Sequence, residues 1–302
     1  MTDAALTPRA LLLALAIVVV WGTNFVVIAF ALHSLPPLLF AALRFAVVAF
    51  PLVFFVRRPD VPWRILAGYG LAIGAGQFGL LFIAINGYIA AGLASLLVQT
   101  QVVFTIAMAM IGSGERLRPL QAAALVLALA GVAVIGANTG GDATITGVLL
   151  VLGAAFAWSL GNMAQRAAGK VDMLAFIAWS SVFAVPPLAG LALWFEGWPA
   201  IRTALDGATP AIWAAVAWQA VGNSLFGYGA WGWLLARYPA ASVAPLALLV
   251  PVFGMGSAAL LLNESLPPWK LAAATLIVGG LGLNLLAARQ PGKANQAGKR
   301  KL

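Results

Sequence analysis

Long apolar stretches separated by short polar breaks run through the whole chain. A membrane-spanning helix needs about 20 mostly apolar residues, and the breaks here are rich in Pro, Gly, Asn and Asp, which favour turns. Ten stretches meet this requirement, and they predict transmembrane helices over residues 10–32, 36–56, 65–85, 90–111, 119–137, 146–167, 174–195, 211–235, 240–262 and 269–287. Residues 196–210 are expected to form the longest loop. The pattern therefore predicts an all-α membrane protein.

One stretch of the chain occurs twice. Residues 115–131 (ERLRPLQAAALVLALAG) return 149 positions later as residues 264–280 (ESLPPWKLAAATLIVGG), with seven identities in 17 positions. The shared turn Glu-x-Leu-x-Pro is polar, so the match is more than common apolar composition. We expect two copies of a five-span unit, at 10–137 and 146–287, joined by a linker at 138–145. Residues 1–9 would precede them, and 288–302 would form a basic disordered tail.

Five spans per unit is an odd number, so the second unit should be inverted relative to the first. The positive charges agree with this arrangement. If the N-terminus is cytoplasmic, 14 of the 17 Lys and Arg residues fall on the inside, and only Arg202 and Lys270 fall outside. Both termini are therefore expected in the cytoplasm. This loop topology also accounts for the net charge of +9 without a nucleic-acid partner.

Composition excludes several classes of chemistry. The chain is 63% apolar and 8% charged, against about 25% charged in soluble domains. It has no cysteine, and its one histidine, His33, stands beside a Pro-Pro turn and is interpreted as a bystander. No Asp or Glu lies inside a predicted span, which argues against a carboxylate proton relay and against an enzyme active site. No metal or cofactor is expected.

Six spans carry polar side chains at one depth, near their centres. An amide facing lipid is costly, so these side chains should face a partner helix or a central cavity. The cavity interpretation predicts a substrate site shaped by aromatic rings and amides: Trp21, Asn24, Gln77, Phe78, Gln99, Trp158, Asn162, Asn223, Tyr228 and Trp231. The alternatives are hydrogen bonds between helices alone and ordinary aromatic packing.

Two further features concern movement and charge. Pro245 and Pro251 should loosen the ninth span and, with Gly76 and Gly227, form the gating hinges. The repeat places Leu96 and Val102 opposite the prolines, so the hinge is expected to be asymmetric. Arg44 is the single ionisable residue well inside a span. It could snorkel, bond to backbone carbonyls, or face the cavity as an anchor for a carboxylate.

The early Trp21-Gly22, its copy at Trp158, the triplet Leu43-Arg44-Phe45 and the paired Glu-x-Leu-x-Pro turns resemble the EamA branch of the drug/metabolite transporter superfamily. The resemblance covers roughly residues 10–288 and is greatest to YddG-type bacterial exporters of aromatic amino acids. It implies an inner-membrane secondary transporter that moves amino acids or related metabolites outward without ATP. We expect it to work by alternating access. The resemblance also implies that spans 1–4 and 6–9 surround the cavity, with spans 5 and 10 outside.

The expected function is therefore export of a zwitterionic amino acid, aromatic or apolar, by a chain that acts as a monomer in the lipid bilayer. Alternatives are threonine- or cysteine-type amino acids, other metabolites or drugs, and nucleotide-linked or phosphorylated sugars. Phosphorylated solutes need a cluster of cations, and only Arg44 is available. A non-transporting membrane scaffold is a more distant alternative. The sequence leaves the exact solute and proton coupling open.

Overall fold

The computed structural model describes residues 6–113, 119–238 and 240–289. Within these ranges the chain is helical, with no strand beyond one isolated bridge between Ile89 and Ala143. Before residue 138 the elements are α1 (Pro8–Leu32), α2 (Pro37–Leu52), α3 (Trp63–Gly70), η1 (Leu71–Gly79), α4 (Leu80–Ile85), α5 (Ala91–Leu97), η2 (Val98–Thr100), α6 (Gln101–Ser113) and α7 (Pro119–Ala137). After it come α8 (Ile145–Ala168), α9 (Met173–Leu191), η3 (Ala192–Glu196), α10 (Trp198–Asp206), α11 (Pro210–Ala217), η4 (Trp218–Tyr228), α12 (Gly229–Arg237), α13 (Ala240–Val243), η5 (Ala244–Leu249), α14 (Val250–Leu261) and α15 (Pro268–Arg289).

Eight continuous helical runs are long and apolar enough to cross a membrane, and α2 is a shorter apolar helix. The second predicted span was expected to reach residue 56, but α2 ends at Leu52. Pro51 lies in its last turn and has no N–H to donate to the carbonyl of Val47, which weakens this end of the helix. Large apolar side chains are exposed around the bundle, as lipid contact requires: Leu12, Val126, Leu149, Trp194 and Leu260.

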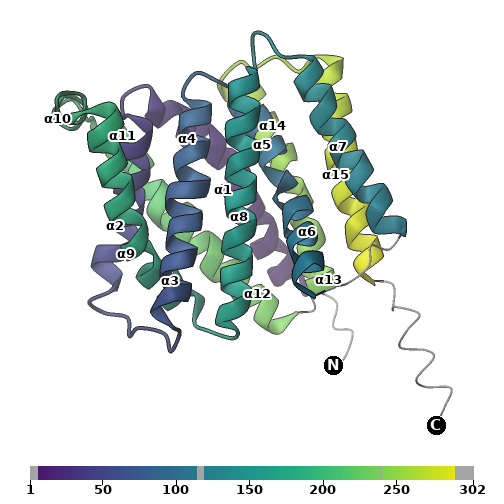
Figure 1. Cartoon of the computed structure of the whole chain (residues 1–302), viewed down its shortest axis with the longest axis horizontal. Coiled ribbons are helices and arrows are strands. Elements are labelled where there is room, and N and C mark those ends of the chain that lie inside the picture. Colours follow the sequence, from purple (N-terminus) through teal and green to yellow (C-terminus); the bar gives the residue numbers. More distant parts are fainter. Residues whose placement is uncertain (1–5, 114–118, 239, 290–302) are drawn as a thin grey trace.

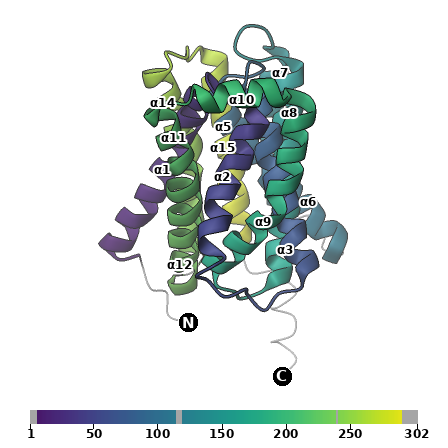
Figure 2. The ribbon, with the colours of Figure 1, turned by 90° about the vertical axis from the view of Figure 1, so that its left-hand side faces the viewer.

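The predicted loop at 196–210 is wrong in one respect, because it contains the short helix α10. Gly197 turns the chain with φ +80°, and Pro199 lies in the first turn of the helix, where its missing N–H costs nothing. One face buries Ile201, while Arg202 and Asp206 form an exposed ion pair one turn apart. This amphipathic helix lies across the end of the bundle (Figure 2).

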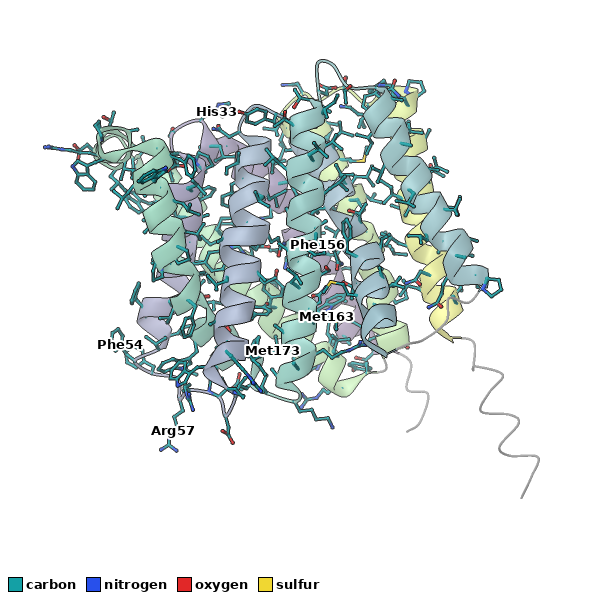
Figure 3. All side chains as sticks on the ribbon, in the orientation of Figure 1. His33, Phe54, Arg57, Phe156, Met163 and Met173 are labelled. Carbon is teal, nitrogen blue, oxygen red and sulfur yellow. The ribbon has the colours of Figure 1, made fainter. Side chains whose placement is uncertain are left out.

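The long helices run side by side as a bundle, with α7 and α15 together at one side (Figure 1). Both ends of the chain leave from the same end of the bundle. Arg57 projects from that end, whereas His33 lies at the opposite end (Figure 3).

The contact between α7 and α15 repeats itself. A Cβ on Gly131 would lie 3.0 Å from the carbonyl oxygen of Ala273, and one on Gly280 would lie 2.7 Å from that of Ala124. Ala124 and Gly131 match Ala273 and Gly280 at the repeat spacing of 149, so each copy makes the same contact with the other. This exchange indicates a local two-fold relation between the helices. The first Glu-x-Leu-x-Pro turn lies outside the described residues.

The same spacing relates the irregular helical segments. The π-helical segment η1, shifted by 149 positions, falls within η4, and the 3₁₀ segment η2 falls within η5. Both copies therefore carry a 3₁₀ interruption, although only the second contains Pro245 and Pro251, and the asymmetric hinge stays a prediction. In η2 the hydroxyl of Thr100 donates to the backbone carbonyl of Leu97 at 2.8 Å, so a side chain bonds to the backbone at this interruption.

At the end of the bundle away from the termini, polar contacts join three loops: the one before α5, the one between α7 and α8, and the one before α15. The buried Lys270 ammonium lies 2.7 Å from a carboxylate oxygen of Asp142 and donates to the carbonyl of Ser265 at 2.7 Å. The Glu264 carboxylate accepts from the N–H of Gly92 at 3.1 Å, which caps the start of α5. Burial raises the pKa of Glu264 above its ordinary value, and the N–H of Gly92 and the Lys270 ammonium offset only part of that shift.

Two glycines of α3 provide a test of helix packing. A Cβ on Gly70 would collide with the backbone carbonyl of Ser180 in α9, whereas a Cβ on Gly68 meets nothing within 4 Å. Gly70→Ala is therefore expected to lower the stability of the protein in detergent by about 1–3 kcal/mol. Gly68→Ala should be neutral or stabilising by up to about 1 kcal/mol, because alanine favours a helix. Thermal unfolding of both variants checks this, and equal midpoints would contradict the close packing.

Candidate functional site

A cavity of about 340 Å³ lies among the central helices. All ten residues proposed from the sequence as substrate-binding line it: Trp21, Asn24, Gln77, Phe78, Gln99, Trp158, Asn162, Asn223, Tyr228 and Trp231. They come from six elements in both halves of the chain: α1, η1, η2, α8, η4 and α12. Neither α7 nor α15 contributes a lining residue.

One wall of the cavity is aromatic. The Trp21 ring lies 5.5 Å from that of Tyr228 and 5.2 Å from that of Trp231, measured between centroids. Its indole N–H donates to the backbone carbonyl oxygen of Asn223 at 3.2 Å. Gly227 makes room for this ring, because a Cβ there would collide with the indole nitrogen of Trp21. The wall is therefore aromatic and closely packed, with ring planes tilted by 50° and 51° to that of Trp21, and it suits an apolar group.

A second wall is built on α8 and α6. The amide nitrogen of Asn162 donates to Gln101 Oε1 at 2.8 Å and to the Thr105 hydroxyl at 3.2 Å. Trp158 lies one turn earlier on α8 and lines the same cavity. Gln99 was expected to line the cavity and Gln101 was not, yet both line it, one on each side of the η2–α6 junction. Tyr69 and Gln165 also line it and were not proposed.

Arg44 is fully enclosed, with 1% of its surface exposed. Its guanidinium donates to Gln219 Oε1 and to the Ser224 hydroxyl, each at 3.0 Å, and its carbon stands 3.5 Å from the centroid of the Phe78 ring. The side chain therefore does not snorkel, and its partners are side chains, not backbone carbonyls. Arg44 does not itself line the cavity, but Phe78 does.

Of the proposed hinge residues, the prolines lie beside cavity-lining residues and the glycines lie at close helix contacts. Pro245 lies in η5 and Pro251 in the first turn of α14, and their neighbours Ala247 and Val250 line the cavity. Gly76, like Gly227, stands at a close contact, since a Cβ there would be 2.6 Å from the Cβ of Ala157. Close packing is thus what the structure shows for both glycines, and their part in gating stays a prediction.

The cavity is unequally enclosed at its two ends. Along α8 and α12 it extends to Gln165 and Leu235, near the end of the bundle where the chain termini lie. Toward the other end, α1, α5 and α14 pack tightly through glycines. Gly254 leaves no space for a Cβ beside Ser95, and a Cβ on Gly22 would be 2.5 Å from that of Phe253. These contacts close the bundle on the side of Glu264.

A family model agrees with this architecture. The EamA-like transporter family matches residues 8–137 and 145–286. The chain belongs to that family. It is accordingly a multi-pass membrane protein and a transporter, not an enzyme.

Individual relatives of this EamA-like chain extend along nearly its whole length. It is 43% identical to a probable amino-acid metabolite efflux pump of Salmonella typhimurium, over 92% of this chain and 95% of the relative. It is 28% identical to a probable terminal-alkyne amino-acid exporter of Streptantibioticus cattleyicolor, over 93% of this chain and 94% of the relative. A crystal structure with 23% identity superposes with a TM-score of 0.60 over 93% of this chain and 98% of the other, which shows a common fold.

Proposed function

We propose that this chain exports amino acids with aromatic or other apolar side chains through the central cavity. The observation that carries the proposal is the convergence of an aromatic wall and several amide side chains on one cavity. Aromatic walls take up an apolar group, while amides bind the ammonium and carboxylate that every amino acid carries. The Salmonella and Streptantibioticus relatives are both named as transporters of amino acids or their metabolites.

The proposed topology has ten spans in two inverted five-span units, divided near residues 138–145, with both termini in the cytoplasm. Besides the eight long apolar runs, α2 and the combined run α11–η4–α12 supply the second and eighth spans. The positive residues support the orientation, since Arg57, Arg166 and Arg237 lie at or near the same end of the bundle as the termini. For a bacterial transporter this places the chain in the inner membrane, acting as a monomer.

The proposed mechanism is alternating access. The 3₁₀ segments η2 and η5 interrupt two spans at related positions beside the cavity, and such interruptions are frequent at hinges. Because the cavity extends toward the cytoplasmic end and is closed near Glu264, we assign this conformation to substrate loading. Opening toward the outside would then separate α5 and α14 where Gly92, Ser95 and Gly254 now pack.

Phosphorylated or nucleotide-linked solutes fit this cavity less well. None of the residues described as lining it is charged, and Arg44 stands behind Phe78. A phosphate needs several cationic donors in direct contact. The geometry therefore favours a solute with one carboxylate and one ammonium group.

Uptake into proteoliposomes tests the proposal. Radiolabelled tryptophan and phenylalanine are expected to enter saturably, compared with empty liposomes, and at rates unchanged by a pH gradient because no acidic residue lines the described cavity. Threonine serves as the polar comparison. Transport of threonine alone would refute the aromatic specificity, and no flux of any amino acid would refute the proposed substrate class.

A further inference from the structure

The buried charge of Arg44 is surrounded by neutral groups. Among the residues that the structure describes, no carboxylate pairs with its guanidinium. Its partners are neutral: Gln219, Ser224, the Asn223 amide and the Phe78 ring. A buried charge without a counter-ion polarises the dipoles around it, because little solvent is present to screen it. The question is what this polarisation does to the cavity.

Arg44 orients two cavity amides in the same sense. Asn223 satisfies its hydrogen bonds with its oxygen toward the guanidinium, accepting from Nη2 at 2.9 Å and Nη1 at 3.3 Å. Gln219, whose oxygen accepts from Arg44, donates through Nε2 to the Asn24 oxygen at 2.7 Å. Both Asn24 and Asn223 thus turn their oxygens toward the arginine network. Their amide N–H groups remain to serve a solute in the cavity.

One amide from the neighbouring pair of elements has the opposite sense. Asn162, on α8, uses its N–H groups on Gln101 and Thr105, so its oxygen remains as an acceptor. Gln77 Oε1, on the adjoining η1, has no hydrogen-bond partner but is buried away from the cavity space. The segments η1 and α8 pack together, as do α1 and η4, which carry Asn24 and Asn223. Donors are therefore presented by Asn24 and Asn223 on one pair of elements, and an acceptor by Asn162 on the other.

We infer that the cavity is a polarised site for a free α-amino acid. The carboxylate would be bound by the N–H groups of Asn24 and Asn223, and the ammonium by the oxygen of Asn162. Arg44 is a positioning residue that acts through Gln219 and Asn223, and its uncompensated charge makes a carboxylate necessary in the solute. The inference rests on the proposed function and adds that amino-acid amides and amines lacking a carboxylate are poor ligands.

The test compares phenylalanine with phenylalaninamide at pH 7 in proteoliposomes. In the unmodified protein, phenylalaninamide is expected to inhibit phenylalanine uptake at least about tenfold more weakly than unlabelled phenylalanine does, since charged hydrogen bonds are the stronger ones. Gln219→Glu adds a carboxylate beside the guanidinium without adding a residue to the cavity lining. This variant should raise the KM for phenylalanine about tenfold. The inhibition constant of phenylalaninamide should stay within about twofold of its value in the unmodified protein.

Asn138→Asp is the matched control, because it adds the same charge at an exposed site just after α7, where the side-chain amide donates to the backbone carbonyl of Val134. Its KM should not change. Should Gln219→Glu fail to reach the membrane, Asn223→Asp places a carboxylate on the same guanidinium and is expected to weaken phenylalanine uptake in the same way.

The outcomes separate the two proposals. If the unmodified protein transports phenylalanine but phenylalaninamide inhibits equally well, the polarised site is refuted and the amino-acid export function stands. If Gln219→Glu and Asn223→Asp both keep the original KM and selectivity, the role of Arg44 is refuted. If no amino acid is transported at all, the proposed function itself fails.

Discussion

Trp158→Ala is expected to reduce phenylalanine uptake at least about tenfold, whereas Phe156→Ala leaves it within about twofold. Both residues belong to α8, two positions apart. Trp158 lines the cavity, while Phe156 is 45% exposed on the surface of the bundle (Figure 3). Removing the Trp158 ring takes away a wall against which the solute would pack. Removing the Phe156 ring costs mainly its contact with Phe104.

Asn162→Ala should cause a similar loss for a different reason. It removes the acceptor proposed for the ammonium and releases Gln101 and Thr105 from the amide that holds them. Initial uptake rates, normalised to the amount of protein inserted into liposomes, provide the measurement. Full activity of both Trp158→Ala and Asn162→Ala would refute the assignment of this cavity as the transport site.

Asp142→Asn is expected to lower the free energy of unfolding by about 3 kcal/mol, the largest stability effect we foresee. Lys270 is 1% exposed and lies 2.7 Å from the Asp142 carboxylate, so the variant would leave its ammonium buried without a directly paired carboxylate, although Glu264 is nearby. Two of the three joined loops lose their strongest contact at the same time. Thermal unfolding in detergent, followed by near-UV circular dichroism, measures the change.

The exposed pair Arg202 and Asp206 is the matched control. Both side chains are more than 70% exposed, so Asp206→Asn should change the stability by less than about 1 kcal/mol. The double variant Asp142→Asn with Lys270→Met should recover part of the loss, because it removes the stranded charge. Equal stability of Asp142→Asn and Asp206→Asn would show that the buried pair does not stabilise this end of the bundle.

The helices and the repeat follow from the sequence by itself. A bilayer of fixed thickness imposes spans of about 20 apolar residues, so their positions can be read from composition along one dimension. Polar groups at a common depth, such as Asn24, Asn162 and Asn223, have few acceptable places apart from the interior. This is why the cavity residues could be chosen without a structure, although their depth alone did not separate Gln99 from Gln101.

The tertiary structure alone decided how those residues are used. The direction in which Asn24 and Asn223 point depends on Arg44 and Gln219, which are 175 positions apart and meet only through helix packing. The pairing of Lys270 with Asp142 and the 3₁₀ interruption at η2 likewise depend on contacts that hydropathy does not encode. Hydropathy determines the depth of a side chain, whereas its hydrogen-bond partners depend on how each helix is rotated against its neighbours.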